Sequence, residues 1–183
     1  MFAGICVVAF PVSDSGVIPL SNLVKLLRQI SKNVFVISSE RFIEASKDAH
    51  YDNIFKLSIK QSTCSNSVDR IKNQLHLQAR ISVEVYKLLN EIDLVILFMG
   101  GEILTIPAMF CKVFNQKMIL LLPGSETESA INRNDPLSWL LNILASITKC
   151  ICNRIVLYSP SLVSYWNLEP YRHKILIAHE HFL

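Results

Sequence analysis

Three short polar stretches interrupt a largely apolar sequence, and their residue types suit the binding of a hydroxyl-rich ligand. They contain Ser13, Asp14, Ser15 and Gly16; Gly100, Gly101 and Glu102; and Gly124, Ser125, Glu126 and Thr127. Hydroxyls and carboxylates form hydrogen bonds with polyols, and glycine lets a backbone approach a ligand closely. A carboxylate in such a stretch can also act as a general base. We therefore predict that these residues line an acceptor or substrate cleft, and we assign no catalytic residue.

Each stretch also has a purely structural interpretation. Ser13 or Ser15 can cap a helix, and the charge of Glu102 can stabilise a helix N-terminus. The stretch around Ser125 can be a solvated loop. A fourth polar stretch, residues 158–161, more readily caps the following helix than binds a ligand. These alternatives stay open from the sequence alone.

Motifs for common cofactors do not occur in the chain. The glycines do not follow the Gly-X-Gly-X-X-Gly spacing, and no Gly-Lys-Ser/Thr sequence is present, so neither a dinucleotide nor a P-loop nucleotide is indicated. Cys150 and Cys152 lack the spacing of a zinc site. His179 and His181 could point the same way from a strand, but no third ligand has a suggestive spacing. We expect no cofactor and no bound metal.

The polar stretches follow apolar runs that alternate with amphipathic segments along the chain. We expect strands at residues 5–10, 34–38, 53–59, 94–99, 118–122, 154–158 and 174–178, and helices at 20–30, 42–50, 68–90, 103–113, 136–152 and 161–166. This alternation predicts one Rossmann-like, doubly wound α/β domain with a mainly parallel sheet over residues 1–183. Ligands of such sheets bind beyond the carboxyl ends of the strands, where the polar stretches would meet.

Composition limits the kinds of partner. Apolar residues make up 51% of the chain and charged residues 18%, so either both faces of the sheet are buried or an apolar surface is left for a partner. The net charge of +3 comes without a cluster of Lys or Arg, which argues against nucleic acid. The segment from Leu137 to Cys152 is apolar around more than one face and carries Trp139. It is therefore either a core helix or an interfacial helix that rests on a membrane.

The cysteines and the N-terminus indicate an intracellular protein. The five cysteines are odd in number and lie mostly in apolar runs, which is typical of buried free thiols. The opening apolar run has no basic start and ends at Pro11, so it favours a strand over a signal peptide. We expect a cytoplasmic location, with peripheral contact at the inner face of the membrane as the alternative.

Four segments spread over the chain share the order and content of a known domain. They are Val7-Val-Ala-Phe-Pro-Val-Ser-Asp-Ser-Gly16; Asp93-Leu-Val-Ile-Leu-Phe-Met-Gly-Gly101; Arg154-Ile-Val-Leu-Tyr-Ser-Pro-Ser161 with Tyr165; and Tyr171-Arg-His-Lys-Ile-Leu-Ile-Ala178 followed by His179-Glu-His181. They resemble segments of the N-terminal domain of retaining glycosyltransferases of family 4, whose GT-B fold has two Rossmann-like domains. In turn, they are similar to its opening strand and glycine loop, its central strand, a strand with a Ser and a short helix, and its lead-out to the second domain.

The resemblance implies the acceptor-side domain of a nucleotide-sugar-dependent glycosyltransferase, which passes a sugar to a saccharide or lipid-linked acceptor. The nucleotide-sugar donor would bind mainly to a C-terminal domain that the chain lacks, so the chain alone would be inactive. Residues 123–126 stand where the family commonly has a His, so that His is not carried over. His179-Glu180 also replaces a common Asn-Gly. Two other hypotheses are a flavodoxin-like module that binds a small ligand or a protein, and an enzyme with its site across a homodimer interface.

Overall fold

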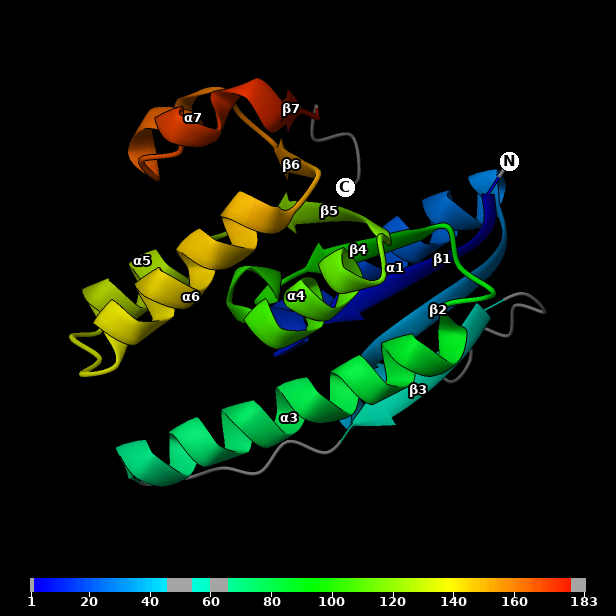
Figure 1. Ribbon diagram of the computed structural model, residues 1–183, viewed down its shortest axis with the longest axis horizontal. Coiled ribbons are helices and arrows are strands. Elements are labelled where there is room, and N and C mark those ends of the chain that lie inside the picture. The colour runs from blue at the N-terminus through cyan, green and yellow to red at the C-terminus, as the bar shows by residue number, and fades with distance from the viewer. Residues whose placement is uncertain (1, 46–53, 60–65, 179–183) are drawn as a thin grey trace.

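A parallel β-sheet runs through the molecule (Figure 1). The computed structural model describes residues 2–45, 54–59 and 66–178, and within them the sheet has seven strands in the order β3-β2-β1-β4-β5-β6-β7. The strands are β1 (Phe2–Ala9), β2 (Ser31–Ser39), β3 (Ile54–Ile59), β4 (Leu94–Phe98), β5 (Lys117–Leu122), β6 (Arg154–Leu157) and β7 (Ile175–Ile177). Their pairings are parallel, and the chain order reverses between β1 and β4. The predicted Rossmann-like α/β fold is confirmed.

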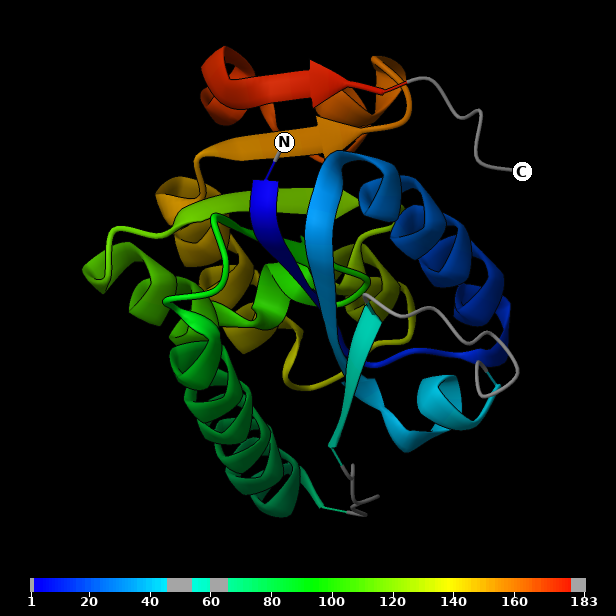
Figure 2. The ribbon, with the colours of Figure 1, turned by 90° about the vertical axis from the view of Figure 1, so that its right-hand side faces the viewer.

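Helices form a layer on each face of the sheet (Figure 2). One face is covered by α1 (Asp14–Ile30) and α2 (Glu40–Ala45), and the other by α3 (Ser67–Leu88), α4 (Thr105–Val113) and α6 (Ser138–Ile151). The short helix α5 (Glu126–Asn132) packs against α6. The remaining helical segments are η1 (Gly101–Ile103), α7 (Ser161–Tyr165) and η2 (Glu169–Lys174), of which η1 and η2 are 3-10 helices.

The central strands are apolar along their length because both of their faces are buried. All of β4 is buried, and β1 is buried from Gly4 onward. Successive side chains of a strand point to opposite faces. Cys6 and Val8 accordingly belong to the core under α3, α4 and α6, whereas Val7 and Ala9 belong to the core under α1 and α2. Two-sided burial therefore accounts for much of the apolar composition.

Buried polar side chains connect the helices α3, α4 and α6. Gln78 of α3 is 1% exposed, and its Oε1 accepts a hydrogen bond from the backbone N–H of Ile106 in α4 at 2.8 Å. Thr105 Oγ1 donates to the carbonyl of Leu144 in α6 at 3.0 Å. Helix α4 follows Leu104, which has no polar side chain to cap it. Gln78 therefore supplies, from another helix, a partner that the first turn of α4 needs.

Residues distant in sequence hold both ends of α6. Arg70 in α3 donates to the two carboxylate oxygens of Asp135 at 3.2 and 2.6 Å, and Asp135 Oδ1 accepts from the N–H of Leu137 at 3.0 Å. At the other end, Lys174 Nζ donates to the carbonyl of Cys150 at 2.7 Å. A cation at the C-terminus of a helix is favoured by the helix dipole.

Some elements differ from the sequence prediction. Helix α1 begins at Asp14 rather than at residue 20, and Pro19 lies inside it rather than ahead of it. Helix α5 occupies a stretch predicted to be a loop, because its polar sequence lacks a helical apolar pattern. The 3-10 helix η2 precedes β7 and was not predicted. The predicted helix over 42–50 is described only to Ala45.

The described cysteines are free thiols. Cys6, Cys111 and Cys152 are buried, and Cys150 is exposed. Burial raises the pKa of Cys111 to about 12 and that of Cys152 to about 11, so both are neutral at physiological pH. Cys64 lies outside the described residues.

Candidate functional site

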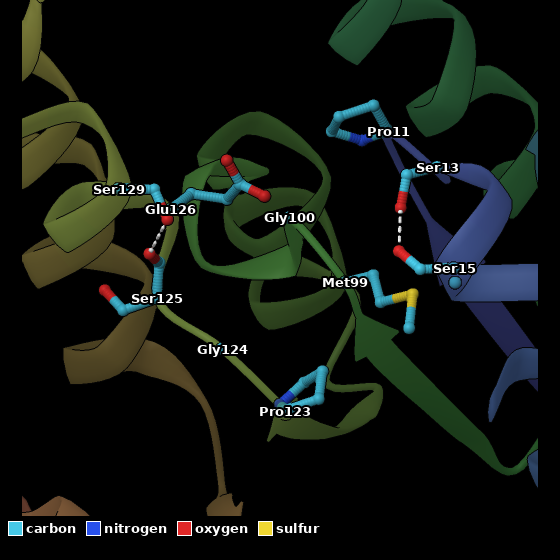
Figure 3. Close-up of a pocket in the computed structure, with 11 residues that line it drawn as sticks. Pro11, Ser13, Ser15, Met99, Gly100, Pro123, Gly124, Ser125, Glu126 and Ser129 are labelled. Carbon is cyan, nitrogen blue, oxygen red and sulfur yellow. Dashed lines mark hydrogen bonds between the residues drawn. The ribbon is translucent and has the colours of Figure 1, made fainter. Parts of the chain in front are cut away.

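A hollow of about 250 Å³ opens at the carboxyl ends of β1, β4 and β5 (Figure 3). The strand order reverses between β1 and β4, and open α/β sheets bind ligands at such a point. The segment after β1, the segment after β4 and the segment after β5 each form part of the wall. The lining residues are Pro11, Ser13, Ser15, Gly16, Met99, Gly100, Pro123, Gly124, Ser125, Glu126 and Ser129.

The first wall is the N-terminal turn of α1. Ser13 is the N-cap residue, but its side chain makes no capping bond, and its Oγ lies 2.9 Å from Ser15 Oγ. Gly16 is buried, and a Cβ on it would lie 2.7 Å from Met99 Sδ. The glycine therefore lets this turn lie close to the segment after β4. The positive end of the helix dipole and two hydroxyls consequently meet at the rim of the hollow.

The middle of the hollow is formed by Met99 and Gly100. The backbone N–H of Phe10 donates to the carbonyl of Met99 at 3.0 Å, which extends the pairing of β1 and β4 beyond the strands. Gly100 has a φ of +70°, and a Cβ there would lie 1.8 Å from the carbonyl oxygen of Phe10. Both the left-handed backbone and this close approach require glycine. The presence of glycine at position 100 is thus explained by the backbone structure, independently of any ligand.

The opposite wall is the turn between β5 and α5. Ser125 is the N-cap of α5, where its Oγ accepts from the N–H of Glu128 at 3.3 Å, and Ser129 Oγ donates to the carbonyl of Ser125 at 2.9 Å. Ser125 and Glu128 have the Ser-X-X-Glu spacing of a capping box. That spacing is the signal in the sequence that could have identified α5.

A buried carboxylate supports this wall from behind. Glu102 is 1% exposed, and its Oε1 accepts from Ser125 Oγ at 3.1 Å and from the backbone N–H of Thr127 at 3.0 Å. Its Oε2 lies 3.0 Å from Lys149 Nζ, close enough for an ion pair but without the alignment of a hydrogen bond. Glu102 therefore contacts the wall of the hollow rather than the hollow itself.

Glu126 places a carboxylate beside the hollow. It is partly buried, and in Figure 3 its side chain points from the β5–α5 wall toward Gly100 and the space between the two walls. Burial raises the pKa of Glu126, and the negative charge of Glu102 raises it further, whereas Arg133 acts in the opposite direction. A half-buried carboxyl with a raised pKa accepts protons more readily than a solvated one.

The structure brings most of the residues predicted for the cleft to this hollow. Those that line it are Ser13, Ser15, Gly16, Gly100, Gly124, Ser125 and Glu126. Those that do not are Asp14, which is exposed, and Gly101, Glu102 and Thr127, which are buried beside the wall. Sequence reasoning did not select Pro11, Met99, Pro123 and Ser129. Whether the lining residues bind a ligand stays a prediction.

The other polar stretches lie elsewhere. The hydroxyls of Ser159 and Ser161 lie 2.8 Å apart at the start of α7, and neither residue lines the hollow. The segment 179–183, with its two histidines, lies outside the described residues. Among the residues that are described, no three side chains of His, Cys, Asp or Glu converge as metal ligands would.

The fold and the hollow define a class of domain, a Rossmann-like α/β domain with a hollow where its strand order reverses. No known protein-family model and no curated protein matches the sequence. Solved structures do match it. UGT89C1 of Arabidopsis thaliana, solved with UDP-L-rhamnose, is 16% identical, with 100% of this chain and 53% of that chain covered and a TM-score of 0.67.

Two further matches are an epimerase and MurG. The UDP-GlcNAc 2-epimerase of Methanocaldococcus jannaschii is 13% identical, with 95% of this chain and 45% of that chain covered and a TM-score of 0.57. MurG of Acinetobacter baumannii is also 13% identical, with 86% and 41% covered and a TM-score of 0.56. The chain thus spans about half the length of these structures. The likeness concerns the fold, and it confirms the GT-B resemblance seen in the sequence.

Proposed function

We propose that this chain is the acceptor-side domain of a nucleotide-sugar-dependent glycosyltransferase that works together with a second Rossmann-like domain. The observation that carries the proposal is the hollow at the reversal of strand order, with a helix N-terminus on one side and a hydroxyl- and carboxylate-bearing wall on the other. The GT-B fold supports it, because the similar structures include one solved with UDP-L-rhamnose. Fold alone does not determine activity, so the site residues must be tested.

The two walls suit the two substrates of a glycosyl transfer, the nucleotide-sugar donor and the saccharide acceptor. The first turn of α1, with Ser13 and Ser15, favours an anionic group such as a diphosphate. The opposite wall, with Ser125 and Glu126, suits the hydroxyls of a saccharide. The second domain would bind most of the donor. The acceptor would bind to the Rossmann-like domain that this chain forms. Acceptors in this proposal are saccharides or lipid-linked saccharides.

Nuclear magnetic resonance titration of the described domain with UDP tests the proposal. We expect weak binding, with shift changes at the backbone amides of Ser15, Gly16 and Gly100. The double substitution of Ser13 and Ser15 by Ala should weaken binding. Ser159→Ala is the matched control, because Ser159 also lies near a helix start but outside the hollow. The proposal would be contradicted if UDP caused no shift changes at the residues of the hollow. It would also be contradicted if UDP bound tightly and Ser159→Ala abolished that binding.

An epimerase is the second candidate, because one of the similar structures is a UDP-GlcNAc 2-epimerase. A transferase needs an acceptor, whereas an epimerase converts the nucleotide sugar by itself. In the test, the chain is combined with a second domain and then incubated with UDP-GlcNAc in the absence of an acceptor. Conversion to a second nucleotide sugar without transfer would favour the epimerase over the transferase.

We propose in addition that the outer side of α4 and α6 rests on a membrane surface. Trp139, Ile143 and Ile147 follow one another at four-residue spacing along α6 and are 63%, 50% and 38% exposed. Met109 and Val113 of the neighbouring helix α4 are 52% and 78% exposed. Neither helix contains an acidic residue. None of the described helices has the length and apolarity needed to cross a bilayer.

The occupant that fits this face is an anionic bilayer, because apolar side chains and an absence of acids favour such a surface. Lys149 does not contribute, since it is buried against Glu102. In co-sedimentation with phosphatidylglycerol vesicles, Ile143→Ser should reduce binding several-fold. Ile18→Ser is the control, because Ile18 is 66% exposed on α1, across the sheet. Equal binding by both variants would contradict the proposal. We propose the cytoplasmic face of the membrane as the location of this contact.

A further inference from the structure

The buried pair of Glu102 and Lys149 lies directly behind the polar wall of the hollow. Taking two charges out of water is costly, and only good pairing and extra hydrogen bonds offset the cost. Here the extra hydrogen bonds come from the β5–α5 turn, through Ser125 Oγ and the N–H of Thr127. The carboxylate of Glu102 is therefore connected to one particular segment of the site.

The two groups that Glu102 holds are the neighbours of Glu126 on either side. Ser125 and Thr127 are both buried, and their hydroxyls lie 2.8 Å from each other. With these neighbours fixed toward Glu102, the intervening side chain of Glu126 is directed toward the hollow (Figure 3). A change at Glu102 should therefore change the placement of Glu126 without touching the hollow.

We propose that Glu126 is the carboxylate that binds a saccharide hydroxyl in the hollow, and that Glu102 is the positioning residue that holds Glu126 there. The inference rests on the proposed function, since it takes the ligand to be a saccharide. Glu126 accepts a hydrogen bond from the hydroxyl. If that hydroxyl oxygen attacks the anomeric carbon of the nucleotide sugar, its proton passes to Glu126. The bond from the anomeric carbon to the diphosphate then breaks, and the diphosphate leaves with the electron pair.

The charges around Glu126 give this arrangement a measurable signature. The pKa of Glu126 is raised by burial and by Glu102 from η1, and it is lowered by Arg133, which follows α5. Lys149 from α6 faces Glu102. Removing the charge of Glu102 should therefore lower the pKa of Glu126, and removing the charge of Arg133 should raise it. A residue at position 102 that served only to fill space would leave the pKa of Glu126 unchanged when it is replaced.

Carbon-13 nuclear magnetic resonance of the Glu126 carboxyl, in the chain without ligand, measures these shifts. We expect Glu102→Gln to lower its pKa and Arg133→Gln to raise it. The amide of Thr127 should stay protected from hydrogen exchange in Glu102→Gln, because glutamine can still accept its hydrogen bond. If Lys149 without its partner unfolds that variant, the double substitution Glu102→Gln and Lys149→Met restores neutrality and serves instead. An unchanged pKa of Glu126 in the Glu102 variants overturns the positioning role of Glu102.

Free N-acetylglucosamine is the probe for the binding role. We expect it to shift the resonances of Ser129 and Gly124, and Glu126→Gln should abolish these shifts while leaving the effect of UDP on Gly16 unchanged. If UDP shifts Gly16 but the sugar shifts neither wall, the proposed function survives and this inference is overturned. If neither ligand shifts the hollow, both are overturned.

Discussion

The backbone at position 100 leaves no room for any residue other than glycine. Its φ is +70°, and a Cβ added there would lie 1.8 Å from the carbonyl oxygen of Phe10, which leaves no room for a side chain. Gly100→Ala should lower the free energy of unfolding by about 1–3 kcal/mol or more, as measured by urea denaturation. Gly124→Ala is the control, since nothing lies within 4 Å of a Cβ added at that position, and it should change stability by at most about 0.5 kcal/mol. Equal losses would mean that the close approach is not the cause.

The ionised carboxyl of Glu126 should reduce the stability of the folded chain at neutral pH. Its pKa in the folded chain is raised, mainly by burial, so the folded state is most stable relative to the unfolded state when the carboxyl is protonated. That stability is fully present below the unfolded pKa and is lost as the pH rises through the folded pKa. Glu126→Gln should therefore raise the Tm at pH 7 and leave it unchanged near pH 3. Calorimetry at the two pH values measures this, and a lower Tm at pH 7 would contradict it.

The residues of the hollow could be predicted from sequence where they follow a strand, but their roles could not. Ser13, Gly100 and Ser125 were selected because each comes soon after an apolar run, and parallel strands bring such positions together. Glu102 was placed in the cleft by the same rule, yet it is buried behind the wall. No sequence pattern indicated its partner, because Lys149 lies on a helix far along the chain.

At the level of elements, the contact of Arg70 with Asp135 joins α3 to the start of α6. The pKa of Asp135 is lowered, mainly by its hydrogen bond from Arg70, so this contact stabilises the fold above the unfolded pKa and is lost as the pH falls through the folded pKa. A double-mutant cycle with Arg70→Gln and Asp135→Asn should give a coupling energy of about 0.5–1 kcal/mol at pH 7. The coupling should vanish at low pH.

The pair Arg172 and Glu169 is the control for that cycle. Its two residues are three positions apart in η2, and their side chains are 78% and 51% exposed. Solvent screens such a pair, so its coupling should be close to zero. A coupling as large as that of the α3–α6 pair would show that the connection between elements adds nothing.

Elements with a clear apolar period were predicted well, and those with polar sequence were not. β4 and α3 fall close to their predicted positions because two-sided burial and a helical stripe leave strong patterns. The first turns of α1 are Asp-Ser-Gly-Val-Ile-Pro, in which Gly and Pro are typical of loops. This segment is nevertheless helical, and its Gly16 lies against Met99, a tertiary contact that local preference does not reveal.

Across the whole molecule, protection from hydrogen exchange should fall from the centre of the sheet toward β7. β1 and β4 each pair on both sides, whereas β7 has β6 on one side and, within the described part of the chain, no strand on the other. Leu176 and Ile177 are also 50% and 37% exposed. Mass spectrometry should find the amides of β1 and β4 to be the slowest and those of β7 to be among the fastest. Slow exchange throughout β7 would contradict this gradient.

The hydrogen bond from Ile106 to Gln78 has a consequence for the order in which the chain folds. Leu104 offers α4 no capping side chain, and the N–H of Ile106 in its first turn uses an acceptor that belongs to α3. A nine-residue helix is also too short to be stable alone. During folding, α4 should therefore become helical only after α3 has docked on the sheet, which makes the earlier helix a template for the later one.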